Sequence, residues 1–293
     1  MSKLKSLIFF GTESFSTPTL EKLLAEGWPV TAVVTKPDSR GGRGQKSIAP
    51  KVKRIADKHG IAVWQPENVS EIDDKIANLK PMYGILVAYG KIIPQTTIDL
   101  FPGGIINVHP SLLPKYRGPS PIESAILNGD SDTGVSIMRL SAGMDKGPVY
   151  AHTRVELDGS ETRPQLYGRL AQSGADLLLE RLPAIVEGRL TPKPQDDELA
   201  TYSQLLKKED GWIDWTKPAE TYGRQVRAYL GFPKSRAKLH GHEAVITKAR
   251  VAQSADDGSL VIKCQPGWLE ILELTAPSGR SMSGADFLRG YKK

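Results

Sequence analysis

The feature that most restricts the fold of this chain is the alternation of apolar runs with amphipathic segments through its first two thirds. Continuous apolar strands that alternate with helices are typical of a mostly parallel sheet covered by helices on both faces. The predicted strands lie at 4–11, 30–35, 61–65, 83–90, 104–109, 133–140 and 148–157. The predicted helices lie at 16–27, 50–60, 70–78, from Pro94 onward, at 120–129 and in a long stretch that ends at Glu187. We therefore expect an α/β fold with a Rossmann-like sheet.

The pattern changes after residue 188. Residues 189–205 contain prolines and have no clean period, so they are predicted to form a linker. A helical segment at 217–231 precedes several short alternating runs separated by glycine turns, which is typical of a small β-barrel. Since 293 residues are many for one hydrophobic core, we expect two domains, at 1–188 and 206–293, the second an OB-like barrel.

Composition excludes several classes of protein. Hydrophobic residues make up 39% and charged residues 25%, which fits a soluble globular chain. No apolar run approaches the roughly 20 residues that a membrane span requires, so we expect a cytoplasmic protein without membrane contact. The one cysteine, Cys264, allows no internal disulfide, and no cluster of Cys and His has zinc spacing.

Positive charge is concentrated in two places. The net charge is +6, and residues 206–293 hold 15 Lys and Arg against 10 Asp and Glu. The glycine-rich segment 35–54 and the segment 224–250 each hold seven basic residues against one acidic residue. Such asymmetry indicates a polyanionic partner, although a merely solvated charged surface remains an alternative from the residues alone.

The stretch INVHPSLLPKYRG, residues 106–118, places an asparagine and a histidine at the end of a predicted strand. Asn107 and His109 are two residues apart, so their side chains project from the same face of an extended chain. Ligands bind at the carboxyl ends of strands in such sheets. An amide donor beside an imidazole suits acyl transfer, because charge develops on one oxygen in the transition state.

A histidine in that role requires a carboxylate to orient it. Asp145, in SAGMDKG, follows the strand predicted at 133–140 and should lie beside the end of the Asn107 strand. There is no Gly-x-Ser-x-Gly elbow, and Cys264 belongs to the other domain, so a covalent nucleophile is poorly supported. From residue chemistry alone, the alternative to an Asn–His–Asp site is a buried histidine that only makes hydrogen bonds within the core.

These motifs match a known pattern. INVHPSLLPKYRGPSPI together with SAGMDKG resembles the folate-dependent formyltransferases, which share Asn-x-His, Ser-Leu-Leu-Pro, Arg-Gly and a later Asp. Within that superfamily the whole chain resembles the family that formylates methionyl-tRNA. This closer resemblance runs through FFGTESFSTPTLEKL, TKPDSRGGRGQK, LVAYGKIIP and DGWIDWTKPAETYGRQVRA.

The resemblance implies that 10-formyltetrahydrofolate, as co-substrate, donates its formyl group to the α-amino group of initiator methionyl-tRNA, without a metal. It implies that Asn107 and His109 stabilise the oxyanion of a tetrahedral intermediate and that Asp145 orients His109 and assists proton removal. The residues implied to bind the folate are Ser111, Leu112, Leu113, Pro114, Tyr89, Gly90 and Ile92.

The same resemblance assigns the basic segments to RNA. The residues expected to contact tRNA are Arg40, Arg43, Lys46, Arg224, Arg227 and Lys234. The first domain would then be catalytic and the second would bind tRNA, in a protein that we expect to be a monomer. A formyltransferase that acts on a small amine, such as a sugar nucleotide, would account only for the catalytic triplet. A non-catalytic RNA-binding module would account only for the charge.

Overall fold

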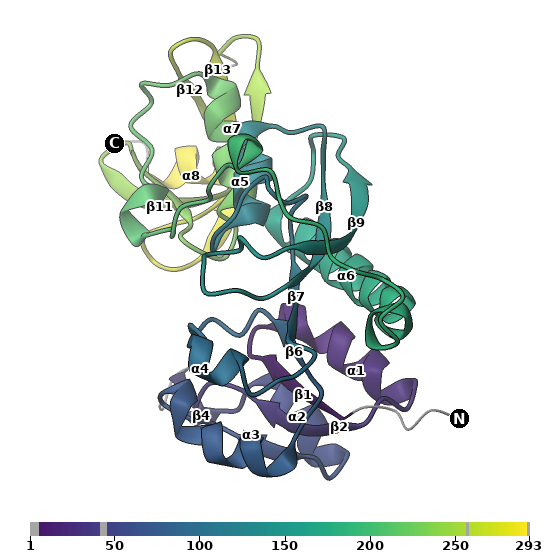
Figure 1. Ribbon diagram of the computed structural model, residues 1–293. Coiled ribbons are helices and arrows are strands. Elements are labelled where there is room, and N and C mark those ends of the chain that lie inside the picture. Colours follow the sequence, from purple (N-terminus) through teal and green to yellow (C-terminus); the bar gives the residue numbers. More distant parts are fainter. Residues whose placement is uncertain (1–5, 42–45, 256–257, 292–293) are drawn as a thin grey trace. The chain divides into compact units, whose positions relative to one another are not determined.

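The computed structural model describes residues 6–41, 46–255 and 258–291 (Figure 1). Contacts divide the chain into two units: unit 1 consists of Met1–Gly118, Gly134–Val155 and Gly168–Tyr202, and unit 2 consists of Pro119–Thr133, Glu156–Tyr167 and Ser203–Lys293. Two segments of the predicted first domain, 119–133 and 156–167, therefore group with the C-terminal residues. The domain boundaries expected from the sequence stay a prediction.

Unit 1 is organised around a sheet that, within the described residues, has seven strands in the order β5-β2-β1-β6-β7-β8-β9. The strands are β1 (Leu7–Gly11), β2 (Val30–Val34), β5 (Ala62–Trp64), β6 (Tyr83–Val87), β7 (Ile105–His109), β8 (Asp132–Arg139) and β9 (Val149–Glu156). Pairing is parallel from β5 to β7 and antiparallel between β7 and β8. The predicted mostly parallel α/β sheet is confirmed.

Helices follow the strands as the alternation predicted. They are η1 (Ser14–Ser16), α1 (Thr17–Ala25), α2 (Lys51–Lys58), η2 (Val69–Ile72), α3 (Asp73–Leu79), α4 (Gln95–Ile98) and α6 (Arg163–Val186). Pro18 lies in the first turn of α1, where its missing N–H costs no hydrogen bond, and Leu20 and Leu23 form the buried stripe of that helix. None of the helices in the described part of the chain has the length and apolar character needed to cross a membrane.

The two faces of the sheet are covered by different helices. On one face, Ile8 and Phe10 of β1 belong to a buried cluster with Ile72 and Ile76 of η2 and α3. Elsewhere in the sheet, α6 approaches β7 so closely that a Cβ on Gly174 would lie 2.7 Å from a methyl group of Val108. Because side chains alternate along a strand, the neighbours of Val108 in β7 project away from α6. Those neighbours are Asn107 and His109.

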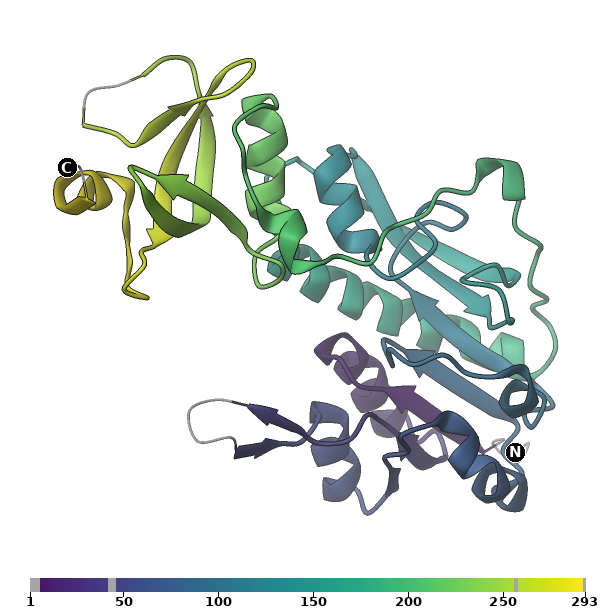
Figure 2. The same ribbon diagram turned by 90° about the vertical axis from the view of Figure 1, so that its left-hand side faces the viewer.

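The basic segment contains a short hairpin that was not predicted. Strands β3 (Ser39–Gly41) and β4 (Lys46–Ile48) pair in antiparallel fashion. Figure 2 shows these two strands standing clear of the large sheet. Two of the basic residues of this segment, Arg40 and Lys46, thus belong to strands that are not part of the large sheet.

The C-terminal part of unit 2 is a curled antiparallel sheet with helices packed against it. Its elements are η4 (Lys208–Gly211), α7 (Ala219–Ala228), β10 (Ser235–Leu239), β11 (His242–Ala252), β12 (Val261–Lys263), β13 (Trp268–Thr275), β14 (Ser281–Ser283) and α8 (Gly284–Tyr291), and α5 (Pro121–Asn128) joins them. Strand order is β10-β11-β13-β12, with β14 on β13, counted over the described residues. The expected C-terminal barrel is thus present as a half-barrel.

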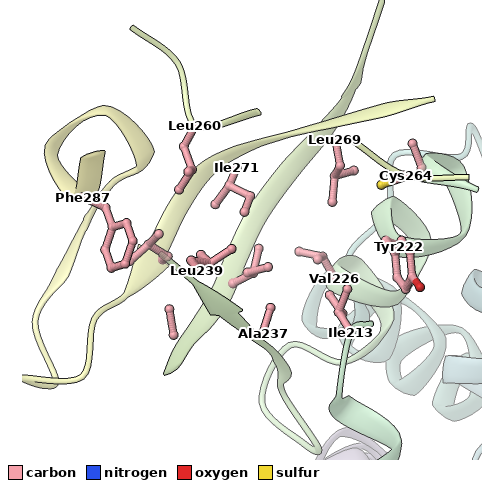
Figure 3. Close-up of a cluster of buried hydrophobic side chains, with 14 of the residues drawn as sticks. Ile213, Tyr222, Val226, Ala237, Leu239, Leu260, Cys264, Leu269, Ile271 and Phe287 are labelled. Carbon is pink, nitrogen blue, oxygen red and sulfur yellow. The ribbon is translucent and has the colours of Figure 1, made fainter. Parts of the chain in front are cut away.

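The half-barrel closes over one apolar core (Figure 3). Ala237 and Leu239 point inward from β10, whereas Lys238 between them is exposed, which is the alternation that predicted the strand. Leu269 and Ile271 of β13 and Phe287 of α8 complete the cluster.

Phe287 supplies a fully buried aromatic ring to this core. Replacing it with Ala should lower the free energy of unfolding of unit 2 by about 3–5 kcal/mol, because both the transfer term and the cavity term are lost. Denaturant unfolding followed by tryptophan fluorescence measures this, since Trp212, Trp215 and Trp268 belong to unit 2. Val251→Ala, at a half-exposed position, is the matched control and should cost far less. An equal loss in both variants would contradict the prediction.

Candidate active site

Asn107 and His109 lie at the C-terminal end of β7, in the middle of the sheet. Asn107 is in register with Leu86 of β6 and Met138 of β8, and His109 is in register with Ser136. Each is only 5% exposed. Among the residues that the structure describes, the amide of Asn107 has no hydrogen-bonding partner, so it remains available to a ligand.

Asp145 faces His109 from the turn that follows β8. A carboxylate oxygen, Oδ2, lies 3.7 Å from Nδ1 of His109, which is an ion-pair distance but too long for a hydrogen bond. The same oxygen accepts a hydrogen bond of 2.8 Å from the backbone N–H of Gly118. Asp145 has a left-handed backbone with φ of +48°, a conformation that aspartate tolerates better than most residues.

The residues at 116–118 contact the side chains of both His109 and Asp145. The carbonyl of Tyr116 lies 3.1 Å from Nε2 of His109. Because a carbonyl can only accept, this contact assigns a proton to Nε2, while Nδ1 faces the Asp145 carboxylate. The ring therefore has a hydrogen-bond acceptor at Nε2 and a carboxylate opposite Nδ1. Gly118, with φ of +108°, completes the turn that directs its N–H at Asp145.

The Ser-Leu-Leu-Pro loop was expected to line the folate site. Two of its side chains, those of Ser111 and Leu113, instead make contacts within the protein. The hydroxyl of Ser111 donates to the carbonyl of Lys115 at 2.6 Å, and Leu113 packs with Met138 and Val149. Leu112 and Pro114 are half-buried. The side chains of Ser111 and Leu113 thus shape the loop, and Leu112 and Pro114 keep partial access to solvent.

Ser136 and His152 support this loop from the neighbouring strands. The Ser136 hydroxyl donates to the carbonyl of Ser111 at 2.6 Å and accepts from the N–H of Leu113 at 3.0 Å. Nδ1 of His152 lies 2.9 Å from the same hydroxyl. Desolvation lowers the pKa of His152, so the neutral ring is favoured in the folded chain. Neither residue was singled out from the sequence.

The second expected donor segment, at 89–92, follows β6. The Tyr89 ring is buried against Phe10, with ring centroids 5.8 Å apart, and burial raises the pKa of Tyr89 to about 12. Its side chain therefore belongs to the core, and only its backbone could meet a ligand. Gly90, with φ of +73°, is exposed, and Ile92 is 91% exposed.

The residues expected to bind tRNA have different positions. Arg43 lies outside the described residues, and Arg40 and Lys46 belong to the β3–β4 hairpin. Arg224 and Arg227 lie on α7 and line a groove of about 590 Å³ in unit 2. Lys234 is exposed after a left-handed turn and does not line that groove.

Two further cations, Lys248 and Arg250 of β11, line the same groove and were not named from the sequence. Arg224 and Arg227 each use one N–H group in a hydrogen bond to the backbone. Arg224 donates to the carbonyl of Asn128 at 3.4 Å, and Arg227 donates to the carbonyl of Glu161 at 3.0 Å. Burial lowers the pKa of Arg227. Lys248 and Arg250 are 62% and 67% exposed, so they remain accessible even though they pair with Glu273 and Glu270.

Comparison with known proteins places this geometry in a family. Residues 4–182 match the family model described as formyl transferase, and residues 205–292 match the formyl transferase C-terminal domain. Over 297 residues the chain is 40% identical to the methionyl-tRNA formyltransferase of Pelobacter propionicus, which covers 98% of this chain and 93% of that relative. The enzyme of the same name from Halorhodospira halophila is 38% identical over 298 residues, covering 98% and 96%.

The chain belongs to the methionyl-tRNA formyltransferase family.

Solved structures share the fold of this family member at lower identity. HypX from Aquifex aeolicus in complex with tetrahydrofolic acid matches with a TM-score of 0.69 and 19% identity; the match covers all of this chain and 48% of HypX. The chain thus spans about half the length of HypX. The N-formyltransferase from Helicobacter canadensis matches with a TM-score of 0.71 and 20% identity over 92% of this chain and 98% of that one.

His152 makes the stability of this family member depend on pH. Its pKa is lower in the folded chain than in the unfolded one, so the unfolded chain binds more protons and stability falls as pH drops from about 7 to 5. His152→Asn should therefore lose less stability than the wild type between pH 8 and pH 5, as measured by denaturant unfolding at each pH. The same substitution at exposed His59 is the control. A wild-type response in the His152 variant would show that this ring does not contribute.

Proposed function

We propose that this chain transfers the formyl group of 10-formyltetrahydrofolate to the α-amino group of initiator methionyl-tRNA. The observation that carries the proposal is the contact between His109 and Asp145 beside the amide of Asn107, which has no partner among the described residues. The chain also matches methionyl-tRNA formyltransferases over nearly its full length. A cytoplasmic, monomeric protein is part of the proposal.

The catalytic residues would act on one oxygen and one proton. When the amine attacks the formyl carbon, negative charge develops on the formyl oxygen. The Asn107 amide would donate to this oxygen together with Nε2–H of His109, which would turn to it from the Tyr116 carbonyl. Asp145 would orient His109 and would accept, directly or through the ring, the proton that the attacking nitrogen loses. When the intermediate collapses, the bond between the formyl carbon and the folate nitrogen breaks, and that nitrogen leaves with the electron pair and takes up a proton in place of the formyl group.

The donor site is proposed between two loops at the carboxyl ends of neighbouring strands. The half-buried Leu112 and Pro114 would contact the folate from one loop, and the backbone around Tyr89 and Gly90 from the other, with the exposed Ile92 nearby. This geometry suits a planar, partly apolar ligand with polar edges, because exposed backbone groups supply hydrogen bonds and the loops supply apolar surface.

The acceptor is proposed to be RNA because four cations line the groove of unit 2, where they outnumber the three carboxylates Asp130, Glu161 and Glu220. Arg224, Arg227, Lys248 and Arg250 can neutralise phosphates, which position an RNA without reading its bases. The β3–β4 hairpin, with Arg40, Lys46 and the undescribed Arg43, would contact the acceptor end. A formyltransferase that acts on a small amine does not require cations that contact a chain of phosphates. Formylation assays with initiator and elongator methionyl-tRNA and with an amino sugar nucleotide separate the two functions.

The first test of the chemistry is His109→Ala, which should lower kcat by about 10²–10³-fold through loss of oxyanion stabilisation. Asp145→Asn keeps the shape of the turn but removes the charge that faces His109, so its kcat should fall by a similar factor. Circular dichroism establishes that both variants are folded. Near wild-type kcat in either folded variant would contradict the proposed roles.

The second test concerns the groove of unit 2. Lys248→Ala and Arg250→Ala should each weaken tRNA binding and reduce the slope of log affinity against log salt by about 0.7–0.9 if each side chain contacts one phosphate. Arg289→Ala removes an exposed cation of the same unit outside the groove and is the matched control. Slopes that equal the wild-type slope in both groove variants would place the RNA on another surface.

A further inference from the structure

The segment that was predicted as a linker is fixed along the candidate active site. We call residues 193–202 the strap. At one end, Lys193 exchanges two backbone hydrogen bonds of 2.8 Å with Val149. At the other end, the N–H of Thr201 donates to the carbonyl of Pro114 at 3.2 Å, and its carbonyl accepts from the N–H of Arg117 at 2.9 Å. Figure 2 shows the chain returning from the C-terminal end of α6 as an extended segment with one short turn, η3 (Asp197–Leu199).

Gln195 of the strap holds the Asp145 turn by its backbone. Its amide nitrogen, Nε2, donates to the carbonyl oxygens of Asp145 and Gly147, each at 2.7 Å. Its amide oxygen, Oε1, accepts from Nε of Arg117 at 3.0 Å. Because carbonyls only accept and a guanidinium only donates, the amide has one satisfactory orientation here. Gln195 therefore connects the turn that carries Asp145 to the loop that carries Gly118.

Arg117 is itself held by the strap. Its side chain is 1% exposed, and its Nη2 pairs with the Asp197 carboxylate at 2.7 Å. Its Nη1 donates to the hydroxyl of Tyr202 at 3.2 Å. The hydrogen bond from Arg117 lowers the pKa of Asp197. The guanidinium is thus a buried anchor, and three of its partners, Gln195, Asp197 and Tyr202, come from the strap.

The Asp145 turn needs such support because its geometry is demanding. A left-handed conformation at a residue other than glycine persists when the surrounding contacts determine it. A Cβ on Gly147 would lie 1.8 Å from the carbonyl oxygen of Arg139, so the turn also packs tightly against its own strand. Gln195 holds the two carbonyls of the turn, while Gly118 holds the Asp145 side chain.

We infer that Gln195 is a positioning residue for formyl transfer, acting through the placement of Asp145 opposite His109. This inference rests on the proposed function. Gln195 reaches the turn through backbone carbonyls, so its loss should misplace Asp145. Gln195 also lines a cavity with Leu113 and Pro114, so KM for the formyl donor has to be measured beside kcat. Misplacement of a catalytic group by about 1 Å can cost about 10²-fold in rate.

The experiment compares Gln195→Ala, Gln195→Glu and the control Leu199→Ala in the full chain. Gln195→Glu keeps the size and the acceptor for Arg117 but places an acceptor against two carbonyl oxygens. Both Gln195 variants should lower kcat by about 10- to 100-fold, with KM for the formyl donor and for methionyl-tRNA within about twofold of the wild type. Leu199, which is 67% exposed on the strap, should tolerate Ala with unchanged kcat.

A second readout separates positioning from general stability. The ¹⁵N chemical shifts of the His109 ring report its charge and hydrogen bonds, and they should change in both Gln195 variants but not in Leu199→Ala. Unchanged shifts and unchanged kcat in folded Gln195 variants would overturn the inference, as would a fall in kcat that only follows the folded fraction. An inactive wild type with Gln195-dependent His109 shifts would instead refute the proposed function and leave the coupling of Gln195 to His109 intact.

Discussion

The Asp145 carboxylate accepts a backbone hydrogen bond from Gly118 and faces His109, and the surrounding loops are arranged so that this contact can exist. Residues 116–118 contribute three separate links: the Tyr116 carbonyl contacts the His109 ring, the Arg117 side chain anchors the strap, and the Gly118 N–H holds Asp145. A carboxylate on a turn without such contacts would sample many positions. Hydrogen bonds from Gly118 and Gln195 restrict the Asp145 turn, so that its carboxylate faces the His109 ring.

The sheet and the clustering of Asn107, His109 and Asp145 could be predicted because their signals are local. Apolar runs predict strands, and capping residues predict where helices begin and end. The spacing of Asn107 and His109 predicts that their side chains share one face of a strand. Asp145 could be expected near them because it follows an adjacent strand. The half-barrel was equally visible in the alternation along β10 and its neighbours.

The strap and its role could not be predicted in this way. Gln195 stands in a proline-containing segment without a period, and nothing near it in sequence marks it as a partner of residues at 117 and 145. Tyr116 has a left-handed backbone, φ of +57°, that aromatic residues seldom adopt, and only the assembled loop imposes it. Grouping of 119–133 with the C-terminal unit likewise depends on helix packing between α5 and α7, which no local pattern records.

The proposed division of labour between the units would have a kinetic consequence. Asn107, His109 and Asp145, the Ser-Leu-Leu-Pro loop and the strap all belong to unit 1, whereas the groove with Arg224, Arg227, Lys248 and Arg250 belongs to unit 2. If that groove holds phosphates that do not react, its contacts are the same before and in the transition state, so they would set affinity for the acceptor. Contacts to the formyl oxygen would strengthen as charge develops there, so they would set kcat. In this scheme Gln195 belongs with the second group, because it acts through the position of Asp145 opposite His109.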